Sequence, residues 1–131
     1  MENKKVSESA LNKLKYKSRY DNDDDIIFEH AIGSISLEFE DGYLALTHPK
    51  FIEVSSYSQK MSILNLFDEV NAEFKAVKFH FIKSYGFVSI EAFYGNEKDF
   101  EFVLSRSMKS MGNALTKFHE IAKKTLDLFD E

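Results

Sequence analysis

The sequence predicts an α+β fold, in the order α-β-β(-β)-α-β-β-α, in which helices pack on an antiparallel sheet. Two hairpin patterns, in residues 35–48 and 77–93, lie on either side of one amphipathic helix, and a long helical pattern ends the chain. A single domain over residues 1–131 is expected, because a chain of this length buries a core without disulfides or metal. Within it, residues 1–25 form a helix and an acidic loop ahead of the main pattern.

The N-terminal part combines a helical pattern with a run of aspartates. Residues 7–17 carry a narrow apolar stripe and are expected to be helical, with Ser7 as the N-cap. Asp21, Asp23 and Asp25 match the first ligand positions of a calcium-binding loop. That loop also needs a glycine and a glutamate at two places where this chain has isoleucine. The sequence therefore excludes an EF-hand and predicts a solvated loop.

The first hairpin is predicted from alternation and from its turn. Apolar and polar residues alternate over residues 34–39, which predicts a strand with one buried face. Asp41-Gly42 predicts a two-residue turn, because glycine adopts the positive φ that a type I′ hairpin needs. The return strand is expected to end near Pro49, and residues 51–54 to add a short edge strand.

A helix and a second hairpin follow. Ser58 is expected to cap the helix, whose apolar residues recur at spacings of three and four, namely Met61, Leu64, Phe67, Val70 and Phe74. Gly86 is expected to provide the turn of the second hairpin. Both faces of this hairpin carry apolar residues, so cover on more than one side is expected.

The last helix is expected to begin at Asn96 and to run for roughly 30 residues, about 45 Å. A compact domain of this size has a radius of gyration near ~14 Å. The helix is therefore expected either to break at Gly112-Asn113 or to project beyond the core. The apolar stripe of its second half is either core or a protein interface. The residues of this candidate interface are Met111, Leu115, Phe118, Ile121, Ala122, Leu126 and Phe129.

Composition excludes several classes of function. With no cysteine, the chain has no disulfide, thiol nucleophile or cysteine-based zinc site, and a cytoplasmic location is expected. The net charge is -5, with six basic residues against two acidic ones in residues 1–20 and one against nine in residues 21–53. An acidic chain of this kind is not expected to bind nucleic acid. No segment is apolar for long enough to cross a membrane.

The search for catalytic chemistry returns little. The sequence has no glycine-rich phosphate loop, no nucleophile elbow and no histidine pair at the spacing of a metal site. His80 and Glu91 are expected to share one face of the second hairpin, where they form a surface pair or an acid–base pair. We expect no enzyme activity, no cofactor and no metal.

The order of elements resembles the type III secretion chaperone-like fold, and within it the bacterial YbjN family of sensory transduction regulators. The resemblance is carried by residues 64–79, where a helix ending in Val70-Asn71 precedes a strand that begins Val77-Lys78-Phe79, and it continues through residues 85–90 and the final helix. The resemblance implies a small acidic α+β domain, often dimeric, that contacts other proteins. It implies no catalytic residues.

Two classes of function follow. The first is a non-catalytic interaction module, chaperone-like or regulatory, that forms a homodimer through its last helix or a sheet edge and binds a client or regulatory protein. The second is a small-molecule-binding domain or enzyme with a pocket between sheet and helices, where polar side chains such as His80 and Glu91 would converge. The first is favoured, because the polar residues are scattered along the chain while apolar residues are concentrated in the last helix.

Overall fold

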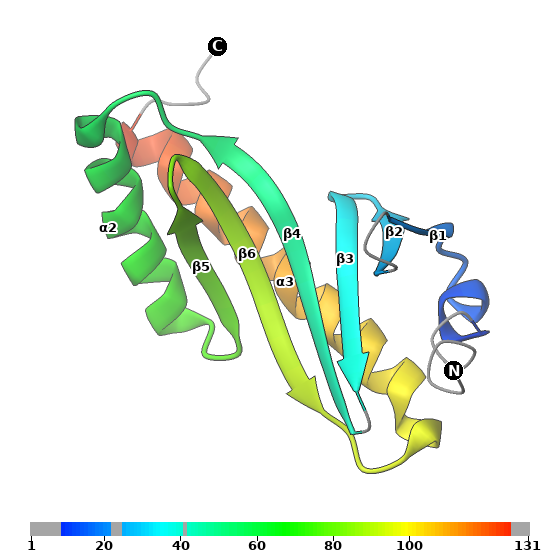
Figure 1. Ribbon diagram of the computed structural model, residues 1–131. Helices are drawn as coiled ribbons and strands as arrows, with labels where there is room; N and C mark the ends of the chain where they lie inside the picture. The colour runs from blue at the N-terminus through cyan, green and yellow to red at the C-terminus, as the bar shows by residue number, and fades with distance from the viewer. Residues whose placement is uncertain (1–8, 22–24, 41, 127–131) are drawn as a thin grey trace.

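The computed structural model describes residues 9–21, 25–40 and 42–126, without the side chains at 97, 125 and 126 (Figure 1). A short helix at residues 9–13 precedes six strands and two long helices. In chain order these are β1 (Ser18–Tyr20), β2 (Ile26–His30), β3 (Gly33–Glu40), β4 (Tyr43–Glu53), α2 (Tyr57–Glu73), β5 (Val77–Ile82), β6 (Tyr85–Phe93) and α3 (Glu97–Leu126).

The strands form one antiparallel sheet in the order β1-β2-β3-β4-β6-β5. The α+β class and the antiparallel sheet are thus confirmed. The sheet is larger than expected, because β1 and β2 add a hairpin in front of β3. Asp21 and Asp25 lie at the two ends of the connection between β1 and β2, where Asp21 N donates to Asp25 O and Asp25 N donates to Asp21 Oδ1, at 2.9 Å each. Asp23 lies outside the described residues.

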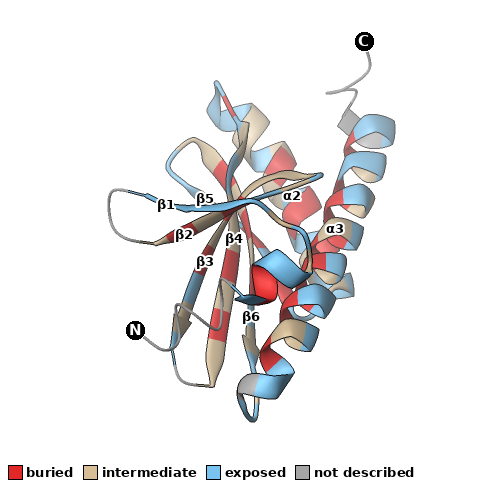
Figure 2. Cartoon of the chain, turned by 90° about the vertical axis from the view of Figure 1, so that its right-hand side faces the viewer, coloured by how far each residue is buried: buried red, intermediate tan, exposed pale blue. Residues whose placement is uncertain are grey.

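The helices lie on one face of the sheet. Figure 2 shows α2, α3 and the short N-terminal helix on the same side, and none of the described helices lies on the opposite side. We call the covered face the inner face and the other the outer face. From β2 across to β5, one register row of the inner face is buried and consists of Ile26, Leu37, Leu46, Ile90 and Val77. Residues along each strand alternate between the two faces, so every strand contributes to both.

A cluster of phenylalanines joins the inner face to both helices. Phe67 of α2 lies with its ring centroid 4.9–6.1 Å from those of Phe51, Phe79, Phe81 and Phe118. Phe118 comes from α3, and the other three come from strands. These contacts fix the relative positions of sheet, α2 and α3, because each ring packs against rings of other elements.

The two hairpin turns differ from each other. Glu40 pairs with Tyr43, so the first turn lies where Asp41-Gly42 was expected, and Gly42 has the positive φ of 78°. Asp41 itself is outside the described residues. The expectation for Gly86 is wrong. Ile82 pairs with Tyr85, so the second turn is Lys83-Ser84, with Lys83 at φ 58°.

Gly86 lies inside β6 for a packing reason. A Cβ added there would lie 2.4 Å from Cγ2 of Ile52 and 3.2 Å from Cζ of Phe67. The glycine therefore lets a neighbouring strand and α2 approach the backbone of β6.

The prediction of a separate edge strand at residues 51–54 is also wrong. β4 continues through Pro49 to Glu53 and pairs with β6 on both sides of an irregularity between His48 and Ile52. Pro49 lies in this irregularity because proline cannot donate a hydrogen bond to a neighbouring strand. The strand pairing resumes beyond it.

The helix ends agree in part with expectation. Asn96 precedes α3 and accepts a hydrogen bond from Lys98 N to its Oδ1 at 2.9 Å, as predicted. The cap of α2 is Ser56 and not Ser58, since Ser56 Oγ accepts from Gln59 N at 3.1 Å. Ser7 lies outside the described residues.

The buried face of α2 is shifted from the expected one. Its buried residues are Ile63, Leu66, Phe67 and Val70, while Met61 is exposed. Among the helices in the part of the chain that the structure describes, none has the length and the apolar run needed to cross a membrane.

Candidate functional site

The apolar stripe in the second half of α3 is covered within the chain. Met111, Leu115, Phe118 and Ala122 are at most 5% exposed, and Ile121 is partly buried against the same core. Of the two alternatives for this stripe, core and protein interface, the burial of these five residues within the chain favours core. The backbone of Leu126 ends α3, and Phe129 lies outside the described residues. The homodimer itself stays a prediction, because no second copy is present.

The path of α3 explains this burial. The helix is continuous for 30 residues and does not break at Gly112-Asn113. Figure 1 shows it crossing the inner face diagonally, and its C-terminal half also packs against α2. β4 alone is 11 residues long, about 36 Å at the strand rise. A helix of 30 residues would project from a compact, spherical domain, but a sheet of this length extends far enough to cover it.

His80 and Glu91 lie on the same outer face but do not form a pair. His80 is opposite Phe87, and the two rings stack with centroids 5.6 Å apart. Glu91 comes two residues after Ser89 on the outer face of β6 and is opposite Ala45 of β4. The strand register thus separates the two side chains by about two rows, roughly 13 Å along β6. No converging acid–base pair exists there.

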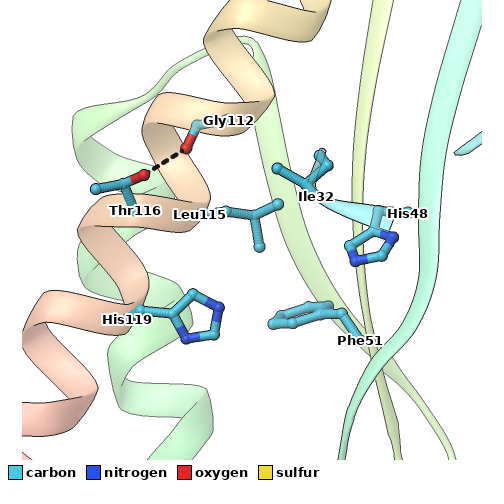
Figure 3. A pocket seen from close by; sticks show the side chains of 7 residues that line it. All are labelled: Ile32, His48, Phe51, Gly112, Leu115, Thr116 and His119. Atoms are coloured by element: carbon cyan, nitrogen blue, oxygen red, sulfur yellow. Dashed lines mark hydrogen bonds between the residues drawn. The ribbon is translucent and has the colours of Figure 1, made fainter. Parts of the chain in front are cut away.

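The convergence of polar groups between sheet and helix occurs elsewhere. A pocket of about 350 Å³ opens between α3, the β2–β3 turn and the irregularity in β4. Its lining consists of Ile32, His48, Phe51, Gly112, Leu115, Thr116 and His119. Figure 3 shows the rings of His48 and His119 turned into this space from opposite walls, with Phe51 and Leu115 between them. We call it the histidine pocket.

The bonding of His48 fixes one proton. Nδ1 of His48 lies 3.2 Å from the carbonyl oxygen of Ser34, and a carbonyl only accepts, so Nδ1 carries a hydrogen and donates it. In the neutral ring, Nε2 is then the nitrogen with the lone pair. Gly33 makes room for this ring, since a Cβ there would lie 2.7 Å from Cε1 of His48.

His119 lies at the mouth of the histidine pocket, where its side chain is exposed. Partial burial lowers the pKa of its imidazole, and the neighbouring His48 lowers that pKa further. The two rings therefore interact electrostatically across the pocket. As long as nothing compensates their charge, protonation of one ring opposes protonation of the other.

Sequence reasoning missed these two histidines as a pair. The local sequence pattern that could have indicated the pocket is the spacing of Gly112, Leu115, Thr116 and His119, which places these four residues on one face of a helix. Nothing local connects that face to His48. The connection depends on the diagonal path of α3 over the sheet.

The outer face of the sheet is the second candidate site. One register row crosses all six strands with mostly small or polar side chains, in the order Arg19, Ile27, Ser36, Thr47, Ser89 and Lys78. Ala45 lies in the next row, between Glu38 and Glu91. The middle of the outer face is therefore low and without bulky groups.

One end of the outer face is aromatic and acidic. Tyr43 and Phe93 face each other with ring centroids 5.4 Å apart, and Phe93 is 79% exposed. Burial raises the pKa of Tyr43, and the carboxylates of Glu91, Glu38 and Glu40 raise it further. The hydroxyl of Tyr43 donates a hydrogen bond to Glu91. Three carboxylates thus surround one exposed aromatic pair.

The opposite end of the outer face is aromatic and more basic. Nζ of Lys50 lies 4.9 Å from the centroid of the Tyr85 ring, and His80 stacks on Phe87. Ile82, opposite Tyr85, is 52% exposed. Glu53 is the acidic residue at this end. Both ends therefore carry aromatic rings, but one end carries three carboxylates, while the other carries Lys50 and Glu53.

Comparisons of the chain with protein-family models, with curated proteins and with solved structures return no match, so the resemblance to the YbjN family stays a prediction. In the part of the chain that the structure describes, no group of three or more histidine, aspartate or glutamate side chains is arranged to hold a metal ion.

Proposed function

We propose that this chain is a non-catalytic protein-interaction module that acts as a homodimer, and that the second copy docks on the outer face of the sheet. The observation that carries the proposal is an outer face that no described element covers, with an exposed apolar side chain at each end, Phe93 at one and Ile82 at the other. A chaperone-like or regulatory role, the type III secretion chaperone-like fold and a cytoplasmic location belong to the same proposal. The client protein has no assignment.

The side chains of the outer face support docking. Antiparallel sheets commonly turn one face to water, and that face is then polar. Here the exposed rows of β6 and β5 include Tyr85, Phe87, Phe93 and Ile82. Apolar side chains gathered on a surface are typical of a protein interface. The second hairpin was expected to be covered on more than one side, and the described helices cover only one.

The charges of the outer face favour a second copy as the partner. In a symmetric dimer each copy uses the same patch, so the patch must complement itself. A twofold axis that lies between two packed sheets and crosses the strands places the acidic end of each copy over the basic end of the other. Glu38, Glu40 and Glu91 then face the end that holds Lys50.

The small residues in the middle of the outer face fit the same arrangement. Packed sheets lie about 10 Å apart, with side chains of both faces interdigitating. Ser36, Thr47 and Ser89 leave the centre without bulky side chains, so the two sheets can approach each other there. The aromatic end of one copy then meets the far end of the other.

The test is the solution mass by light scattering over a range of protein concentrations. Phe93→Glu removes an exposed aromatic ring and adds a fourth carboxylate to the acidic end, so dimerisation should weaken at least about tenfold. Phe102→Glu is the matched control, because Phe102 is 65% exposed on α3, away from the sheet. The mass of this control should equal that of the native chain.

A charge exchange tests the complementarity. Glu91→Lys should weaken the dimer, and adding Lys50→Glu in the same chain should restore it in part, because the introduced lysine of one copy then faces the introduced glutamate of the other. A native chain that is monomeric up to millimolar concentration would refute the homodimer. Equal effects of Phe93→Glu and Phe102→Glu would refute the outer face as the interface.

A further inference from the structure

We propose that the histidine pocket binds a small organic carboxylate, whose charged group lies between the imidazoles of His48 and His119 and whose apolar body packs on Ile32, Phe51 and Leu115. This site is separate from the outer face, since α3 and the inner face of the sheet form it. The proposal stands whether or not the chain dimerises.

The lining decides the sign of the ligand's charge. The titratable residues among the lining residues are the two histidines, and no lysine, arginine or carboxylate joins them. On α3 itself, Glu120 and Lys123 are the exposed charged neighbours of His119. Two imidazoles without a carboxylate are an incomplete ligand set for a metal ion. An anion instead accepts hydrogen bonds from both rings.

The size and the walls of the pocket decide the rest of the ligand. A volume of about 350 Å³ lies at the lower end of the range for small-molecule sites. Phe51 supplies an aromatic wall that is stacked with His48 at a centroid distance of 6.0 Å, and Ile32 and Leu115 supply aliphatic walls. A ligand with one charged end and a short apolar body matches these walls.

Gly112 is an independent indication that the pocket is kept open. Glycine is the least favourable residue in a helix interior after proline. A Cβ added at Gly112 meets no atom within 4 Å, so packing within the chain does not require this glycine. Because Gly112 lines the pocket on the same helix face as His119, any larger side chain at this position takes up space that a ligand would fill.

Carboxylate binding should take up one proton. His48 already uses Nδ1 to donate to Ser34, so its Nε2 can donate to an anion only when the ring is an imidazolium. The proton comes from water, and the bound pair of carboxylate and imidazolium is then neutral. Affinity should therefore rise as the pH falls from 8 to 6.

The experiment is a titration of the full chain with hexanoate, followed by NMR of the imidazole nitrogens and by calorimetry. Hexanamide, which has the same shape without the charge, is the ligand control. We expect the signals of His48 and His119 to shift together with a dissociation constant on the order of 1 mM or tighter at pH 6. Hexanamide should bind at least about tenfold more weakly.

Two variants make the test specific. Gly112→Leu should abolish hexanoate binding by filling the pocket, and leucine suits a helix, so folding should persist. His119→Ala changes an exposed residue and should weaken binding at least about tenfold. Gly95→Ala, whose Cβ would make only an ordinary contact of 3.6 Å with Asp99 outside the pocket, should leave binding unchanged.

Three results would overturn the proposal. The first is equal binding of hexanoate and hexanamide, and the second is unchanged hexanoate binding by Gly112→Leu. The third is a shift of both imidazole signals by Zn²⁺ alone, reversed by a chelator, with no response to hexanoate. That third result would assign a metal to the two histidines instead of an anion.

Discussion

The two faces of the sheet are built from the same strands and differ in almost every physical respect. The inner row of Ile26, Leu37, Leu46, Ile90 and Val77 is at most 4% exposed. The adjacent outer row has serine, threonine and lysine at three of the matching strands, namely Ser36 on β3, Thr47 on β4 and Lys78 on β5. Alternation of apolar and polar residues along each strand thus gives the sheet one face that stabilises the fold and one face that is available for contact with another protein.

The largest expected effect belongs to the inner face. Phe67→Ala removes a ring that is 1% exposed and contacts rings from the sheet and α3, so the free energy of unfolding should fall by about 3–5 kcal/mol. Phe93→Ala, on the outer face, should change it by less than about 0.5 kcal/mol. Urea unfolding at a dilution where the chain is monomeric measures both. Similar losses would remove the distinction between the faces.

The next effect concerns the join between α2 and the edge of the sheet. The Asn71 side chain accepts from Phe79 N at 2.7 Å and donates to Phe79 O at 3.0 Å, which satisfies both backbone groups at the outer edge of β5. Asn71→Ala should cost about 2–3 kcal/mol, because both groups lose their partner. Asn113→Ala, at an exposed helix position, is the control and should stay within about 0.5 kcal/mol.

The closeness of the inner packing is tested at Gly86. Gly86→Ala forces a Cβ against Ile52 and Phe67, so unfolding midpoints should show a loss of about 1–3 kcal/mol. Gly95→Ala is again the matched change, and its effect should be small. If both alanines are tolerated equally, the inner face is less tightly packed than its exposures indicate.

Substitution of Gly112 should raise the free energy of unfolding, unlike the changes above. Gly112→Ala adds a methyl group that clashes with nothing and removes the conformational entropy of a helical glycine. Thermal unfolding should show a gain of about 0.5–1 kcal/mol. A loss of stability would mean that the packing around α3 requires the glycine.

The smallest effect is the dependence of stability on pH. Burial lowers the pKa of His30 and of His119 in the folded chain, so the unfolded chain binds more protons near and below about pH 6.5. Stability should be complete above that pH and should fall as the pH decreases through the lowered pKa values. Ring protonation at His30 also removes the acceptor of the Ile32 amide, 3.3 Å away.

Urea midpoints at pH 7.5 and 5.5, for the native chain and for His30→Gln, measure this dependence. The variant should lose less stability on acidification than the native chain. An equal loss in both would remove His30 as a cause.

Much of the fold follows from local patterns. The alternation in residues 34–39, the Asp41-Gly42 turn and the cap at Asn96 each act within a few residues, and the structure has the expected features at all three places. The strands β1 and β2 escaped prediction because they are short and both border the aspartate run. Gly86 was misread because a glycine required by packing and a glycine required by a turn look alike in sequence.

The candidate sites depend on long-range geometry instead. From the sequence pattern alone, Leu115 and Phe118 fit a core position and an interface position equally well. The diagonal path of α3 decides between the two. His48 and His119 come together only across that path. The composition of the outer face could be read from alternation, but whether another part of the chain covers it could not.

The central claim is that the outer face is covered by a second copy, and thiol reactivity at Ala45 tests it most directly. The chain contains no cysteine, so Ala45→Cys introduces a single reactive thiol on that face, between Glu38 and Glu91. We predict that its alkylation is at least about tenfold slower in the native background than in the Phe93→Glu background. The thiol of Phe102→Cys should react equally in both. Equal rates for Ala45→Cys in the two backgrounds would contradict the account.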